Sequence, residues 1–234
     1  MKKVLIALSL FVALLAQASM AKAAELWTST GASYKFADRH SISLESENRF
    51  GGLASLPGHY LYNTTLGYKF DWVKWDSGSF AIAPAIRYEK EDGNDGEYRP
   101  MVNLELKQKF GGGTIGVRNR VEVRLRGSQK RIRERLRLKY NLFSFKVGDR
   151  VKISPYVSNE IFYQKALTDG SGGRGFDQNR VVPAGVSIDH SFEDSYLKKM
   201  SWDLYYMVDM DKGGSGWTAN HVAGVGLKFS LGPR

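Results

Sequence analysis

The sequence predicts an all-β protein, an antiparallel transmembrane β-barrel of about 10–12 strands whose N-terminal signal peptide is removed. Three observations lead to this prediction: an export signal, a series of segments in which polar and apolar residues alternate, and aromatic residues at both ends of the apolar faces. Alternation with a period of two indicates strands, because successive side chains of a β-strand point to opposite faces.

The first 23 residues have the pattern of a secretory signal peptide. Lys2 and Lys3 form a basic start, residues 4–15 are almost entirely apolar, and Ala21-Lys22-Ala23 fits a cleavage site. The apolar run is shorter than the about 20 residues that a membrane-spanning helix needs. We therefore expect a signal peptide over residues 1–23 and a single outer-membrane β-barrel domain over residues 24–234. The chain has no cysteine, which excludes disulfides and thiolate metal sites.

Turn-forming residues separate most of the segments that we predict as strands. These segments are 25–36, 40–50, 59–73, 78–91, 97–110, 113–127, 130–142, 150–164, 177–190, 199–210 and 217–231. Eleven strands would not close with both termini in the periplasm, so we expect ten, with segment 25–36 set aside, or twelve. The long connections 51–58, 91–97, 165–176 and 211–216 then share one rim, as in outer-membrane barrels.

Aromatic residues mark both ends of the apolar face of two strands. Tyr60 and Trp72 are twelve positions apart, and so are Tyr98 and Phe110. At about 3.3 Å per residue and a tilt near 40–45°, this separation covers roughly 28–30 Å along the membrane normal. The apolar band of a membrane barrel is about 25 Å tall. The spacing favours a bacterial outer-membrane barrel over a soluble barrel, which would carry its apolar face inside.

The positive charge of the chain is concentrated in one hairpin. The whole chain has 34 basic and 24 acidic side chains, a net charge of +10, and residues 118–139 have 10 basic and 2 acidic ones, a net charge of +8. Such a local concentration argues against a nucleic-acid-binding surface. The cations expected to face the barrel lumen are Arg118, Arg120, Arg124, Arg126, Arg131, Arg133, Arg135, Arg137 and Lys139.

Like charges face one another in this hairpin. A four-residue turn at 127–130 would place Arg126 opposite Arg131, Arg124 opposite Arg133, Glu122 opposite Arg135, Arg120 opposite Arg137 and Arg118 opposite Lys139. Each like-charged pair would repel by roughly 0.75 kcal/mol in water and about 3 kcal/mol at an effective dielectric constant near 20. The arginines therefore need neutralising groups or water around them. Glu134 falls on the apolar face, so we expect it at or outside the membrane interface.

Three arrangements would relieve the repulsion. Water could fill the lumen, an anionic solute could bind or pass there, or acids from other strands could interleave with the arginines. The acids expected in the lumen are Glu45, Glu47, Glu105, Glu122, Glu160, Asp203 and Asp209. The leading hypothesis is a porin-like channel or binding lumen that favours anionic small solutes. The alternatives are a closed structural or interaction barrel without transport, and arginines near a rim that meet lipid phosphates or a partner.

No pattern of catalytic or metal-binding residues is present. His40, His59, His190 and His221 are scattered without metal-ligand spacing. His190-Ser191 with Glu193 lies at a strand end, where a role in a loop is expected. We expect no enzymatic activity, no cofactor and no bound metal. The expected partners are outer-membrane lipid and anionic small solutes, with no nucleic acid, and the barrel is expected to be a monomer. Arg180 has an ambiguous orientation, because Pro183 could mark a bulge.

Several strand segments together resemble a known family. They are Glu47-Asn48-Arg49-Phe50, Arg118-Asn119-Arg120-Val121-Glu122, Arg135-Leu136-Arg137-Leu138-Lys139-Tyr140, residues 155–163, Asn179-Arg180-Val181 with Ala184-Gly185-Val186, and Leu204-Tyr205-Tyr206-Met207. This pattern is similar to the bacterial outer-membrane family catalogued as domain of unknown function 2490. The resemblance implies a barrel fold and an outer-membrane location, and no particular activity. The arginine hairpin alone has a weaker similarity to small monomeric porins for acidic sugars.

Overall fold

The structure is a computed structural model, and it describes residues 24–51, 58–168, 175–193, 195–213 and 216–233. The signal-peptide prediction concerns residues outside these ranges. Among the described residues, none forms a helix with the length and apolar character needed to cross a membrane.

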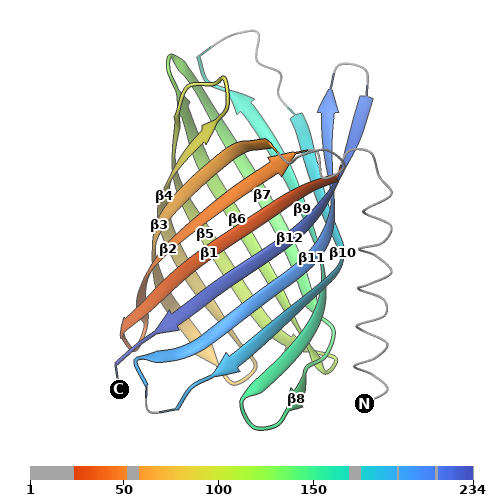
Figure 1. Ribbon diagram of the computed structural model, residues 1–234. Coiled ribbons are helices and arrows are strands. Elements are labelled where there is room, and N and C mark those ends of the chain that lie inside the picture. The colour runs from red at the N-terminus through yellow and green to blue at the C-terminus, as the bar shows by residue number, and fades with distance from the viewer. Residues whose placement is uncertain (1–23, 52–57, 169–174, 194, 214–215, 234) are drawn as a thin grey trace.

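One sheet closes on itself to form a barrel of eleven long strands (Figure 1). Neighbours in sequence are neighbours in the barrel, and a short additional strand, β8, continues the ladder of β7 along the end of β9. The strands are β1 (Ala24–Ala37), β2 (His40–Gly51), β3 (Gly58–Trp75), β4 (Gly78–Glu91), β5 (Glu97–Phe110), β6 (Gly113–Arg126), β7 (Gln129–Asn141), β8 (Phe145–Val147), β9 (Val151–Ala166), β10 (Gly175–Ser191), β11 (Leu197–Gly213) and β12 (Gly216–Leu231). The all-β barrel prediction is confirmed.

The barrel closes with an odd number of strands, so the expectation of ten or twelve is wrong. β1 pairs with β2 in the antiparallel sense and with β12 in the parallel sense, for example Thr28 with Val225. Segment 25–36, which was set aside, is the closing strand. A parallel ladder also satisfies the backbone hydrogen bonds of both strands, so closure does not require an even number. In Figure 1, β1 and β12 lie side by side and point to the same end of the barrel.

The two ends of the barrel differ. We call the end where β2, β4, β6, β9 and β11 finish the loop rim, because the four long predicted connections follow β2, β4, β9 and β11. The opposite end, where β1, β3, β5, β7, β10 and β12 finish, is the turn rim. The first described residue therefore lies at the loop rim and the end of β12 at the turn rim.

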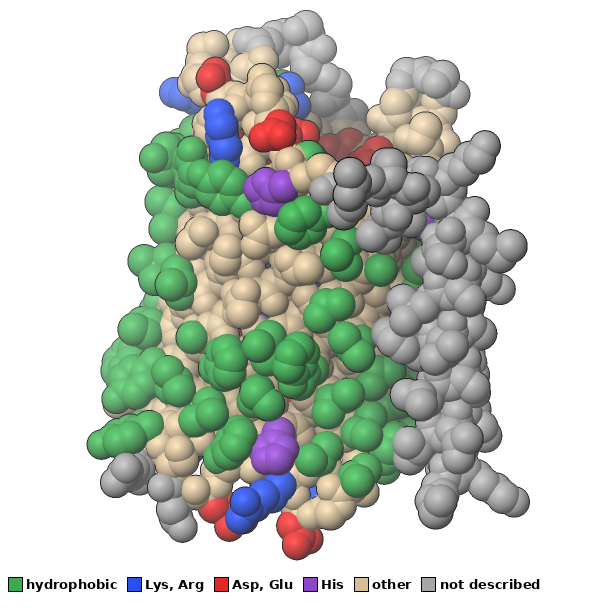
Figure 2. Space-filling view, in the orientation of Figure 1, with side chains coloured by type: hydrophobic (Ala, Val, Ile, Leu, Met, Phe, Trp, Pro, Cys, Tyr) green, Lys and Arg blue, Asp and Glu red, His purple; other side chains and the backbone are tan. Residues whose placement is uncertain are grey.

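The outer surface carries two belts of aromatic rings. Near the loop rim, ring contacts join Phe50, His59, Tyr62, Tyr88 and Tyr98 in a continuous series across four strands. Near the turn rim, contacts join Phe36, His40, Tyr68, Phe70 and Trp72. Between the belts the outer face carries exposed apolar residues such as Leu44, Leu66 and Ile86. Figure 2 shows charged side chains only at the two ends of this face.

The belts fix the height of the apolar band. Tyr62 and Trp72 both point outward on β3, with 38% and 55% of their surface exposed. Ten residues at about 3.3 Å each and a tilt of 40–45° give roughly 23–25 Å between them along the barrel axis. Tyr60, expected in the outer belt, is instead half-buried and donates a hydrogen bond to Glu25, because a register shift follows Arg49 on the neighbouring strand.

Two inward-facing tyrosines lie flat on glycines of the adjacent strand. A Cβ atom built on Gly224 would lie 1.9 Å from the Tyr205 ring, and one on Gly185 would lie 2.2 Å from the Tyr156 ring. Real Cβ atoms do not approach ring atoms so closely. These glycines are therefore required for the close approach of the rings, not for an unusual backbone angle.

We expect Gly224→Ala to destabilise the barrel by about 1–3 kcal/mol, because the methyl group would force the Tyr205 ring off its site. The measurement is the free energy of unfolding by urea in lipid vesicles. Gly116→Ala is the matched control, since its Cβ would meet nothing closer than 3.8 Å. Equal stability of the two variants would contradict the proposed packing.

Candidate functional site

The interior of the barrel contains a cavity of about 250 Å³ whose wall is strongly cationic. Nine cations line it against four carboxylates, a net charge of +5 on the described lining. The cations are Arg49, Arg87, Arg118, Arg120, Arg135, Arg137, Lys139, Arg180 and Lys228, and the acids are Glu45, Glu47, Glu160 and Asp203. Every barrel strand except β5 contributes a residue to the cavity.

The arginine hairpin faces this interior in a different register from the one predicted. Only Gly127 and Ser128 connect β6 to β7, and Gly127 has a φ of 53°, a left-handed angle that suits glycine. The turn is thus two residues long, and each pair shifts by two positions: Arg124 lies opposite Arg131, Glu122 opposite Arg133, Arg120 opposite Arg135 and Arg118 opposite Arg137. Lys139 lies opposite Gly116, so three like-charged pairs remain instead of four.

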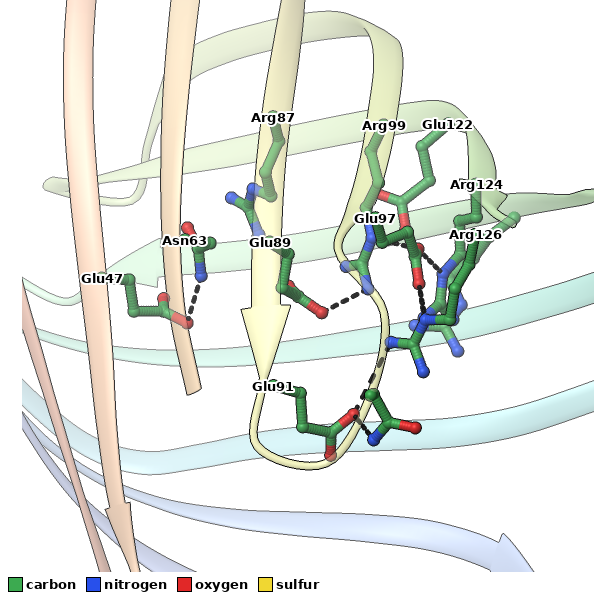
Figure 3. A network of polar contacts seen from close by, with 12 residues as sticks. Glu47, Asn63, Arg87, Glu89, Glu91, Glu97, Arg99, Glu122, Arg124 and Arg126 are labelled. Atoms are coloured by element: carbon green, nitrogen blue, oxygen red, sulfur yellow. Dashed lines mark hydrogen bonds and ion pairs between the residues drawn. The ribbon is translucent and has the colours of Figure 1, made fainter. Parts of the chain in front are cut away.

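Near the loop rim, one carboxylate holds three arginines. Glu97, at the start of β5, accepts hydrogen bonds from Arg99, Arg124 and Arg126, the last at 3.0 Å (Figure 3). Arg99 also donates to Glu89 on β4. Glu97 is 2% exposed, and Glu89 and Arg99 are equally well buried. Buried ion pairs of Glu97, Glu89 and Arg99 therefore fill this part of the interior.

A second group of ion pairs lies beside the first. Glu160 on β9 binds Arg118 at 2.8 Å and Arg135 at 3.1 Å. Arg133 binds Asp177 at 2.9 Å. Glu122 is fully buried with Arg135 at 3.7 Å, and neither of its oxygens has a hydrogen-bond partner among the described residues.

Aromatic rings support the buried guanidinium groups. The ring of Phe162 has Arg135 at 4.6 Å and Arg180 at 4.8 Å from its centre, and Arg49 stacks over Trp27 at 3.7 Å. Cations over aromatic faces gain electrostatic energy, most of all where water is excluded. Phe162 and Trp27 are almost completely buried, so the loop half of the interior is a packed layer.

The turn half of the interior is open by comparison. Its inward-facing side chains are mainly small residues and lysines, and Ser43 and Lys107 remain solvent-exposed. Two ion pairs lie here at 3.0 Å, Lys69 with Glu105 and Lys228 with Glu45. A second cavity of about 280 Å³ adjoins the first along β5, β6 and β7. The interior is therefore closed toward the loop rim and more open toward the turn rim.

Four cations of the cavity wall lack a carboxylate partner. Within the described part of the chain, no carboxylate oxygen lies within 4.0 Å of the charged nitrogens of Arg87, Arg120, Arg137 or Lys139. Arg87 donates to the Thr65 hydroxyl at 2.9 Å, and Arg120 to the Asn103 amide oxygen at 2.6 Å. Lys139 lies over the Tyr156 ring at 3.4 Å. The cavity wall thus carries four positive charges that no described carboxylate contacts.

A comparison with protein-family models matches residues 24–220 to the family described as protein of unknown function (DUF2490). The chain belongs to this family. No curated protein matches the sequence. The resemblance inferred from the strand segments is therefore confirmed for the DUF2490 family, and the similarity to small porins stays a prediction.

In this DUF2490 barrel the predicted hairpin cations divide into two groups. Arg118, Arg120, Arg135, Arg137 and Lys139 line the first cavity. The others lie nearer the loop rim: Arg124 and Arg126 bind Glu97, Arg133 binds Asp177, and Arg131 lines a small cavity with Gln129.

The predicted acids of the DUF2490 barrel have partners on several strands. Glu47 binds Arg49 at 2.8 Å, and Asp209 binds Arg180 at 3.0 Å. Asp203 accepts a hydrogen bond from Ser187 at 3.0 Å. Glu45, Glu105, Glu122 and Glu160 have the partners described above. Of the contacts of the predicted acids, Glu45 with Lys228 and Glu160 with Arg118 join strands far apart in the sequence.

Sequence reasoning missed several residues of this interior. Glu97 and Arg99 share the polar parity of Met101 and Asn103, so alternation alone could have found them. Arg180 points inward because the register of β10 shifts between Val181 and Ala184, around Pro183. Trp27 shares the polar parity of Glu25 and Ser29, and Phe162 shares that of Glu160 and Gln164, so alternation could also have assigned these two aromatics to the interior.

Two further predicted positions lie away from the cavity. Glu134 is exposed on the outer surface opposite Tyr163 and accepts a hydrogen bond from Asn119 at 2.7 Å. His190 lies at the end of β10, with its ring 4.6 Å from that of Phe192. Among the described residues, no three metal-ligand side chains are grouped closely enough to hold an ion.

Proposed function

We propose that this chain is a bacterial outer-membrane barrel whose cationic interior binds small anionic solutes. The observation that carries the proposal is the cavity wall, whose described residues have a net charge of +5 and include four cations with no described carboxylate in contact. Fixed positive charge in a confined, low-dielectric site raises the local concentration of anions. Water and anions are the remaining means of relieving the repulsion between Arg118 and Arg137, which face each other across β6 and β7.

The outer surface supports the proposed location. An apolar band roughly 23–25 Å tall between two aromatic belts agrees with the about 25 Å band of membrane barrels. On the face drawn in Figure 2 the charged side chains lie at the two ends, as in a lipid-embedded barrel, whereas Glu134 is an acid exposed on the outer surface of β7. The proposal takes outer-membrane lipid as the environment, a monomer as the working unit, and no catalytic step. The test is fractionation of expressing cells, with the barrel expected in the outer membrane.

A closed barrel without solute binding is the second candidate. It is favoured by the loop half, where Glu97 and Glu122 are buried at 2% and 0% exposure among arginines. This packed layer argues against a wide, permanently open pore. A closed barrel does not account for the excess positive charge of the first cavity.

Charged cysteine reagents distinguish the two candidates, because the chain has no cysteine of its own. Ser43→Cys places a thiol on the open half of the interior, and Asn94→Cys provides a solvent-exposed reference between β4 and β5. The measurement is the rate of modification by an anionic methanethiosulfonate divided by the rate with a cationic one. We expect this ratio to be on the order of tenfold higher at position 43 than at position 94.

Asn63→Cys is the control for closure. Asn63 is 1% exposed in the loop half, so its thiol should stay unmodified by either reagent. Equal reactivity ratios at positions 43 and 94 would overturn the anion preference. Fast modification at position 63 would overturn the closed loop half.

A further inference from the structure

The two interior cavities meet at three cations. Arg118, Arg137 and Lys139 line both of them, one from β6 and two from β7. A molecule at this junction would contact these three side chains from either cavity. Arg120 lies two positions along β6 from Arg118, on the same face.

This junction offers more hydrogen-bond donors than the described chain satisfies. Arg137 and Lys139 have no ion pair within 4.0 Å among the described residues, and Arg118 shares its carboxylate, Glu160, with Arg135. The Nε atoms of Arg118 and Arg135 are buried without a hydrogen-bond partner in the part of the chain that the structure describes, and Arg135 is only 7% exposed. Buried polar groups are normally paired, and a ligand with acceptor oxygens would pair with such donors.

The donors specify the chemistry of that acceptor. Guanidinium groups bind the oxygens of phosphates and carboxylates through two parallel hydrogen bonds, and an ammonium group adds a compact charge. Because Arg120, Arg137 and Lys139 all lack a counter-charge in contact, a single negative charge would leave most of the excess in place. A ligand with two or more negative charges fits the site better than a monovalent anion.

Size and access narrow the ligand further. Ligand pockets commonly measure about 300–1,000 Å³, and the first cavity, at about 250 Å³, lies below that range. The ligand must therefore be compact. Its path leads from the turn rim, where Lys107 on β5 is solvent-exposed. The packed layer around Glu97 closes the other direction.

We propose that the junction of the two cavities is a binding site for a compact multivalent oxyanion, held by Arg118, Arg120, Arg137 and Lys139 and reached from the turn rim. This inference rests on the proposed anion-binding function and assigns its site and its ligand class. The oxyanion groups are phosphates or carboxylates, which share the same recognition by guanidinium.

Calorimetric titration of the refolded barrel in detergent micelles tests the proposal. The probes are pyrophosphate and citrate as multivalent anions and acetate as a monovalent one, all at the same ionic strength. We expect pyrophosphate, citrate or both to bind at least tenfold more tightly than acetate. Binding of pyrophosphate alone would assign phosphate groups to the ligand, and binding of citrate alone would assign carboxylates.

Matched variants test the location. R120Q/R137Q should weaken multivalent binding by about 10–100-fold. The control is K35Q/K109Q, which removes two charges from the turn rim outside the cavities. Its affinity should stay within about twofold of that of the unaltered barrel. R120K/R137K keeps the charge and loses the bidentate geometry, so its affinity should fall between the two. If R120Q/R137Q does not fold, K139Q supplies the same test at the junction.

The outcomes separate the two levels of the proposal. If R120Q/R137Q and K139Q leave multivalent binding unchanged, the junction is not the binding site. The proposed anion-binding function of the interior would still hold. Acetate binding as tightly as pyrophosphate and citrate would overturn the ligand class alone. No binding of any anion, together with equal reagent ratios at positions 43 and 94, would overturn the proposed function itself.

Discussion

Replacing Glu97 with glutamine is expected to destabilise the barrel by about 3–5 kcal/mol, the usual cost of removing one partner from a buried ion pair. The two carboxylate oxygens of Glu97 accept hydrogen bonds from Arg99, Arg124 and Arg126 at 2% exposure. Glutamine keeps the shape but has one acceptor oxygen and no charge. The three guanidinium groups would then repel one another in a region that excludes water.

The same substitution should open the loop half of the interior. Mutual repulsion would drive Arg124 and Arg126 toward solvent at the loop rim, because Glu97 is the carboxylate that both of them bind. The measurements are the free energy of unfolding in lipid vesicles and the single-channel conductance in planar bilayers. We expect E97Q to show lower stability and a higher conductance than the unaltered barrel.

Glu91→Gln is the matched control. Glu91 is 3.6 Å from Arg126 at the same rim, but its side chain is 38% exposed. An exposed pair of this kind contributes at most about 1 kcal/mol, so stability and conductance should change little. Stability of E97Q equal to that of E91Q would mean that water or other groups compensate the arginines, contrary to the packed layer described here.

The parts of this interior that sequence alone can predict follow from local periodicity. Alternation in residues 118–139 assigns the arginines to one face, and the aromatic positions of β3 and β5 indicate which face is outside. Both properties depend only on neighbours along one strand. They are therefore independent of how the barrel closes.

The sequence does not reveal which side chains meet across different strands. Glu97 meets Arg124 across 27 positions, and Arg118 meets Glu160 across 42, so each pair depends on strand order, register and tilt together. A shift of two residues in the β6–β7 turn changes every partner in the hairpin. The predicted turn included Gln129 and Lys130, whereas the left-handed angle of Gly127 allows the two-residue turn observed.

The closing strand is the second place where a general expectation misled the prediction. Bacterial single-chain barrels usually have an even number of antiparallel strands, and that regularity was used to set β1 aside. The residues of β1 argue otherwise. Trp27 is 4% exposed inside the barrel, beneath Arg49, so β1 completes the packed layer as well as the sheet.

A disulfide between β1 and β12 is expected to form almost completely and to stabilise the barrel by about 5 kcal/mol, because it would close a loop that includes nearly the whole chain. Thr28 and Val225 are direct partners in the parallel ladder. Neighbouring strands lie about 4.8 Å apart, within the range of Cα separations that disulfides bridge. The chain has no native cysteine, so T28C/V225C gives an unambiguous product on oxidation.

Thr28→Cys with Ala219→Cys is the control pair, since Ala219 lies six positions from Val225 along the same strand and face, roughly 20 Å away. Oxidation should shift the gel mobility of T28C/V225C and leave that of the control unchanged. A ten-stranded barrel, in which β2 rather than β1 meets β12, would cross-link neither pair. The unfolding midpoint before and after reduction then measures how much the disulfide contributes, because only the bond between positions 28 and 225 of the variant differs between the two states.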